Sequence, residues 1–124
     1  MARVAIIEDD QMIAQMYRMK FEADGFVVDL AEDGRAGVEM VLQSPPDLLL
    51  LDLTLPELDG KDILKMMRQN PATHQTPVIV LTNLEAPELP TQLASFGIAD
   101  YIVKADETPR EIVAKVKKIL GLAK

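Results

Sequence analysis

The chain has 124 residues, 48% of them hydrophobic, which suits one compact domain over residues 1–124 and excludes a second folded domain. Its formal net charge of −7 argues against direct binding to nucleic acid, and the absence of cysteine excludes disulfides, thiolate metal sites and cysteine nucleophiles. No apolar run approaches the roughly 18 residues that cross a bilayer, so we expect a cytoplasmic protein without a membrane partner.

The first half of the chain alternates short apolar runs with segments of helical spacing. Strands are expected at residues 4–7, 26–30 and 48–51, and helices at residues 11–21 and 34–42. An Asp-Gly pair and a Ser-Pro-Pro sequence mark the ends of the two helices. The third strand consists of four leucines, which is typical of a strand buried on both faces of a sheet.

The second half continues the same alternation. We expect a helix over residues 60–67, a strand over 78–81, a short helix over 89–96 and a strand over 101–103. The last helix should begin at Thr108, because the following proline and a glutamate three residues on complete a capping box.

Five expected strands alternating with five expected helices indicate an α/β fold. Parallel strands joined by right-handed crossovers form a doubly wound sheet with helices on both faces. Ligands of such sheets bind at the carboxyl ends of the strands. Residues that follow the first, third, fourth and fifth strands should therefore meet at one edge.

Acidic residues follow two of these strands. Glu8, Asp9 and Asp10 come after the first strand, and Asp52 ends the third. Like charges about 4 Å apart repel by roughly 4 kcal/mol at an effective dielectric constant of 20, so the cluster requires a cation. Oxygen ligands without histidine or cysteine suit Mg²⁺. The alternative is that Asp9 or Asp10 only caps the first helix.

Thr82 and Lys104 follow the fourth and fifth strands. A hydroxyl group and a cation facing carboxylates would neutralise the oxygens of a transferring phosphoryl group. Each residue alone has an ordinary explanation, since threonine is common in strands and lysine at a strand end is usually solvated. Their coincidence with the acidic residues favours a phosphoryl-transfer site.

The segments VAIIEDD, DLLLLDLTLPELDG, VIVLT and ADYIVK carry these residues. Through them the chain resembles, over essentially its whole length, the receiver domain of bacterial two-component response regulators, and in particular the chemotaxis regulators. The resemblance implies a single flavodoxin-like domain with strand order 2-1-3-4-5. It also implies a phosphoacceptor that catalyses only its own phosphoryl transfer and dephosphorylation, rather than an enzyme acting on other substrates.

The resemblance also assigns roles to the acidic residues. Asp52 would be the phosphorylated carboxylate, and Asp9 and Asp52 would bind Mg²⁺ directly. Glu8 would act through a bound water molecule, and the backbone carbonyl of Thr54 would complete the protein ligands.

The same resemblance implies how the signal is read. Thr82 would donate a hydrogen bond to a phosphoryl oxygen, Lys104 would pair first with Asp52 and then with the phosphoryl group, and Tyr101 would be the switch aromatic. The donor would be a sensor histidine kinase or a histidine phosphotransfer protein, because the only histidine here, His74, is expected to be solvated. Downstream effectors would bind the switched surface, and a phosphorylation-dependent homodimer is left open.

The chain departs from the family at three positions. Ala105 replaces the proline that usually follows the lysine, and a cis bond to a residue other than proline costs about 3 to 4 kcal/mol, so we expect a trans bond and a rerouted loop. Asn83 and Leu84 follow the threonine. Because Leu84 cannot orient a water molecule, slow hydrolysis of the phosphorylated state is expected.

Helical spacing also links Met12, Met16 and Met19, which with Ile13 are interpreted as core residues rather than as a methionine-rich binding face.

Competing functions make specific demands on the sequence. A flavodoxin-like electron carrier needs phosphate-binding hydroxyls and glycines where Glu8 to Asp10 stand. A phosphohydrolase with an aspartyl-phosphate intermediate needs an acid where Thr54 stands. A degenerate receiver that binds proteins without phosphorylation is the third alternative, and the presence of Asp52, Asp9, Thr82 and Lys104 argues against it.

Overall fold

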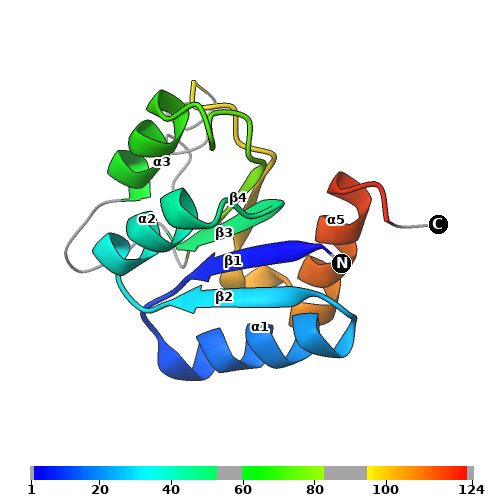
Figure 1. Ribbon diagram of the computed structural model, residues 1–124. Coiled ribbons are helices and arrows are strands. Elements are labelled where there is room, and N and C mark those ends of the chain that lie inside the picture. Colours follow the sequence, from blue (N-terminus) through cyan, green and yellow to red (C-terminus); the bar gives the residue numbers. More distant parts are fainter. Residues whose placement is uncertain (1, 53–59, 83–94, 123–124) are drawn as a thin grey trace.

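The computed structural model describes residues 2–52, 60–82 and 95–122, and these form one five-stranded parallel sheet in the order β2-β1-β3-β4-β5 (Figure 1). In chain order the elements are β1 (Arg3–Ile7), α1 (Gln11–Ala23), β2 (Val27–Ala31), α2 (Gly34–Gln43), β3 (Leu48–Asp52), α3 (Gly60–Gln69), β4 (Val78–Thr82), β5 (Asp100–Val103), the 3-10 turn η1 (Lys104–Asp106) and α5 (Pro109–Ile119). The predicted strands and their order are confirmed. The helix expected over residues 89–96 lies, apart from its last two residues, outside the described part of the chain.

Helices cover both faces of the sheet, as the alternating pattern predicts. α1 and α5 lie on one face and α2 and α3 on the other (Figure 1). Each face has its own apolar core, and residues of β1, β3 and β4 contribute alternately to the two. β3 and β4 are buried along their whole length. This explains why the residues of both strands are apolar on both faces of the sheet up to the terminal Asp52 and Thr82. Within the described residues, no helix has the length and apolar character needed to cross a membrane.

Two helix starts are built as the sequence predicts. The backbone N–H of Glu111 donates to Thr108 Oγ1 at 3.2 Å, and the backbone N–H of Thr108 donates to Glu111 Oε1 at 3.0 Å, which completes the capping box. At α1 the cap is Asp10, whose Oδ1 accepts from the N–H groups of Met12 and Ile13. Asp10 therefore caps the first helix, which is one of the alternatives that the sequence left open.

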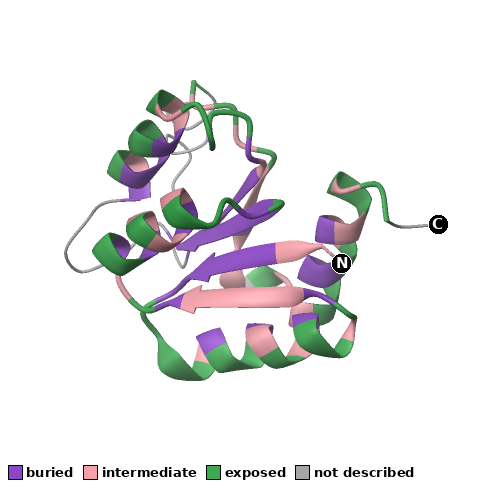
Figure 2. Ribbon diagram, in the orientation of Figure 1, coloured by how far each residue is buried: buried purple, intermediate pink, exposed green. Residues whose placement is uncertain are grey.

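The prediction that methionines fill the core under α1 is wrong. Met12, Met16 and Met19 are 84%, 47% and 69% exposed, and the outward side of α1 is open along its length (Figure 2). Ala14, Tyr17 and Phe21 face the sheet instead, with Ile13 partly buried beside them. The helix carries two apolar stripes on opposite sides, and the aromatic one is buried because its larger rings fill the space above β1 and β2.

Candidate functional site

Lys104 joins two carboxylates at the carboxyl edge of the sheet. Its Nζ donates to Glu8 Oε1 at 2.8 Å, to Glu8 Oε2 at 2.7 Å and to Asp52 Oδ2 at 3.1 Å. Glu8 follows β1, Asp52 ends the neighbouring β3, and Lys104 follows β5, so the sheet order brings together side chains up to 96 positions apart. The family resemblance implied that Lys104 pairs first with Asp52; that contact is present, but the shorter contacts are with Glu8.

These three side chains are almost completely removed from solvent. Glu8 and Asp52 are 0% and 2% exposed, and the side chain of Lys104 is 7% exposed. Burial raises the pKa of Glu8 to about 7, with a further contribution from Asp52, although the hydrogen bonds from Lys104 oppose it. Burial lowers the pKa of Lys104, but its bonds to Glu8 and the charge of Asp52 outweigh this and the net shift is upward. Lys104 thus stays charged at neutral pH and serves as an internal counter-ion.

Asp9 adds a third carboxylate on the solvent side. One oxygen from each of Glu8, Asp9 and Asp52 lies within 4.8 Å of the others, and Asp9 is exposed whereas the other two are buried. The set offers oxygen ligands only, and the exposed Asp9 brings it into contact with solvent. This donor set fits Mg²⁺, which favours carboxylate oxygen and keeps several water molecules.

Thr82 and Tyr101 lie on β4 and β5, the two strands beyond β3. Thr82 ends β4, is buried, and pairs in register with Val103, the residue before Lys104. Tyr101 on β5 is half-buried and packs against the core on the side of α2 and α3. Thr82 therefore ends the strand next to Asp52, as the strand order predicts, whereas Tyr101 lies one strand further away, in register with Val80. Thr54, Asn83 and Leu84 lie outside the described residues, so what we expected of them stays a prediction.

Tyr17 of α1 lies near the site and was not among the residues predicted from the sequence. Burial raises its pKa, and the charges of Lys104, Glu8 and Asp52 also act on its hydroxyl. Its spacing with Ala14 and Phe21 could have identified it as facing the sheet.

Residues 4–117 match the family model of the response regulator receiver domain. The chain belongs to this family. It is 37% identical over 123 residues to the phosphate regulon transcriptional regulatory protein PhoB of Rhizobium meliloti, covering 98% of this chain and 53% of that protein. It is 38% identical over 121 residues to the transcriptional regulatory protein CpxR of Escherichia coli, covering 97% and 50%. This receiver domain thus spans about half the length of these relatives.

Solved structures agree with this assignment. The receiver domain of the Francisella response regulator 1452 superposes with a TM-score of 0.88 at 29% identity, over 98% of both chains. The chemotaxis protein CheY4 of Vibrio cholerae, at 24% identity, shares the fold with a TM-score of 0.89 over 96% of this chain and 98% of that one. The chain is a signalling domain of the two-component type, which disfavours the electron carrier and the phosphohydrolase.

The receiver domain also shows how the chain continues after Lys104 without the usual proline. No peptide bond among the described residues is cis, and the bond between Lys104 and Ala105 is trans, as expected. The backbone then makes the single 3-10 turn η1 before it reaches the Thr108 cap of α5.

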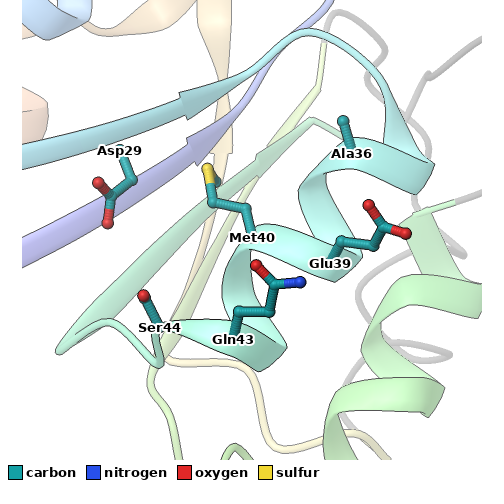
Figure 3. A pocket seen from close by; sticks show the side chains of 6 residues that line it. All are labelled: Asp29, Ala36, Glu39, Met40, Gln43 and Ser44. Atoms are coloured by element: carbon teal, nitrogen blue, oxygen red, sulfur yellow. The ribbon is translucent and has the colours of Figure 1, made fainter.

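A separate pocket lies between β2 and α2 (Figure 3). It has a volume of about 320 Å³ and is lined by Asp29, Ala36, Glu39, Met40, Gln43 and Ser44. None of the predicted site residues lines it, and the Asp29 carboxylate is already paired with Arg3 Nη1 at 2.8 Å. The pocket therefore contributes nothing to the site at the carboxyl edge.

Proposed function

We propose that this receiver domain, over residues 1–124, accepts a phosphoryl group on Asp52 in a Mg²⁺-dependent reaction and signals through its surface. The observation that supports this most is the bridge from Lys104 to Glu8 and Asp52 beside a third carboxylate, at the edge where parallel sheets bind ligands. In the reaction an oxygen of Asp52 forms a bond to phosphorus while the bond between phosphorus and the donor histidine nitrogen breaks.

Some of these residues would bind the metal ion, and Lys104 would bind the phosphoryl group. Glu8, Asp9 and Asp52, with the backbone carbonyl of Thr54, would hold Mg²⁺, which when bound neutralises charge on the phosphoryl oxygens. Lys104 can leave Asp52 for a phosphoryl oxygen while it remains bonded to Glu8, because its ammonium group has three donors.

Phosphorylation of Asp52 would change the conformation of side chains on β4 and β5. The new oxygens are acceptors for the hydroxyl of Thr82, and movement of Thr82 lets the half-buried ring of Tyr101 repack and shifts the population between two surface conformations. This chain would act in the cytoplasm, with a sensor histidine kinase or histidine phosphotransfer protein as donor and a downstream effector protein or domain as target. Whether a second copy of the chain binds in the phosphorylated state is left open.

Intact-mass analysis tests the proposal. With Mg²⁺ and a small acyl phosphate, the wild-type chain should gain one phosphoryl group, and Asp52→Asn should gain none. Asp62→Asn, an exposed residue in the first turn of α3, is the matched control and should react like wild type. A chain that takes up no phosphoryl group but still binds its partners would be the degenerate receiver.

The exposed methionines of α1 suggest where a protein donor binds. Asp52 lies close to Glu8 and Asp9, which follow β1, and the stripe of Met12, Met16 and Met19 begins just after them. Such an apolar, adaptable surface suits protein binding.

Met12→Lys should therefore slow transfer from a phosphorylated protein donor by about tenfold, which corresponds to one lost interface contact of about 1.4 kcal/mol. Its reaction with an acyl phosphate should be unchanged. Met66→Lys, an exposed methionine on α3, is the control and should affect neither reaction. Equal slowing with both donors would contradict this docking site.

A further inference from the structure

Arg68, in the last turn of α3, lies at the end of the sheet where β4 and β5 begin. Its guanidinium group donates to four backbone carbonyl oxygens: from Nε to Phe96 O at 2.7 Å, from Nη1 to Thr76 O at 2.9 Å and Thr73 O at 3.1 Å, and from Nη2 to Gly97 O at 3.4 Å. Among the described residues it forms no ion pair with a carboxylate. Within residues 2–52, 60–82 and 95–122, the hydrogen bonds of its guanidinium group all go to backbone oxygens.

These oxygens belong to two segments that are distant in sequence. Thr73 and Thr76 lie in the loop before β4, whereas Phe96 and Gly97 lie in the turn before β5. A planar guanidinium group presents donors in several fixed directions and can bind both segments at once. A lysine ammonium group is a single point charge and cannot span them in the same way.

The position of β5 depends on hydrogen bonds at its two ends. Among the strands that the structure describes, β5 is an edge strand of four residues and pairs with β4 alone. At its carboxyl end it is held through the bonds from Lys104 to Glu8. At its start, the backbone N–H of Ala99 donates to Val78 O at 2.8 Å, and Arg68 bonds to Phe96 and Gly97, three and two positions before Ala99.

We propose that Arg68 is a positioning residue, which fixes the start of β5 against the end of α3 and thereby places Tyr101 and Lys104. The contacts exist without a phosphoryl group, so the role of Arg68 does not depend on whether Asp52 is phosphorylated.

Amide hydrogen exchange, resolved by NMR on the unphosphorylated 124-residue chain, tests the proposal. In Arg68→Lys the amides of residues 98–103 should exchange about tenfold faster, because at least one charge-assisted hydrogen bond is lost. The amides of β1 and β2 should keep their rates, and the ring signals of Tyr101 should shift. Arg18→Lys is the matched control, since the Arg18 side chain on α1 bonds only to Glu22 among the described residues.

Unchanged exchange over residues 98–103 would overturn the proposal. A uniform increase in all strands would overturn it as well, because that is the signature of lower global stability without local positioning. If Arg68→Lys does not fold, Arg68→Gln gives the same comparison with a side chain that can serve only one of the two segments. Failure of Asp52 to accept phosphate would leave this result standing, so the two proposals are tested independently.

Discussion

Replacing Lys104 with methionine is expected to lower the free energy of unfolding by about 3–5 kcal/mol at pH 8 without metal. Methionine keeps most of the apolar stem but leaves Glu8 and Asp52, which are 0% and 2% exposed, without the ammonium group that bonds to both. Urea denaturation in the presence of a chelator measures the loss. Lys65→Met, on the exposed side of α3, is the control and should change stability little.

The loss of stability should depend on pH in a defined direction. Folding raises the pKa of Glu8 from 4.5 to about 7, so between these values the folded chain binds a proton that the unfolded chain releases. The stability that Glu8 contributes in this way is complete below pH 4.5 and is lost as the pH rises through 7. A protonated Glu8 needs no cation, so the deficit of Lys104→Met should shrink toward pH 4.5. An equal deficit at pH 5 and pH 8 would contradict this.

Mg²⁺ offers a second check on the same variant. If Glu8, Asp9 and Asp52 bind the ion, it can replace part of the missing positive charge. At a concentration 100 times the dissociation constant, a ligand that binds only the folded state stabilises it by about 2.7 kcal/mol. Asp9→Asn introduced into Lys104→Met should reduce this gain. If Mg²⁺ leaves the stability of Lys104→Met unchanged, these carboxylates do not form a metal site.

Gly37→Ala is expected to destabilise the chain by about 2 kcal/mol, against the gain of up to about 1 kcal/mol that alanine normally brings to a helix interior. A methyl group on Gly37 of α2 would lie 2.5 Å from Ile7 Cδ1 and 2.7 Å from Ile7 Cγ1. Ile7 is completely buried and directly precedes Glu8, so the clash would also displace the site.

A double-mutant cycle measures this clash. Ile7→Val removes the Cδ1 atom, so Gly37→Ala should cost less in that background than in wild type. Thermal or urea unfolding of the four proteins gives the coupling energy. A cost of Gly37→Ala that does not depend on residue 7 would show that the close packing of α2 on β1 is not the cause.

Local signals were sufficient for most of the fold. The apolar runs of β1, β3 and β4, the caps at Asp10 and Thr108, and the alternation of strands and helices all depend on residues a few positions apart. The known behaviour of parallel sheets then placed Glu8, Asp52 and Lys104 at one edge, where the structure has them. Family resemblance supplied the roles, which spacing alone left open.

Other features required the tertiary structure. α1 has two apolar stripes of similar spacing, and only the fit of Tyr17 and Phe21 against the sheet decides that Met12, Met16 and Met19 face outward. Periodicity measures the angle between residues on a helix but not which side is covered.

By itself, then, the sequence determined the order of the elements and which charged residues reach the carboxyl edge, because both follow from local pattern and sheet topology. The tertiary structure decided how those charges pair and what holds them in place. Lys104 shares its charge between Glu8 and Asp52, and Arg68 bonds to carbonyl oxygens of two distant segments. Backbone oxygens are the same in every residue, so partners of this kind become visible only when the folded chain brings them within hydrogen-bonding distance.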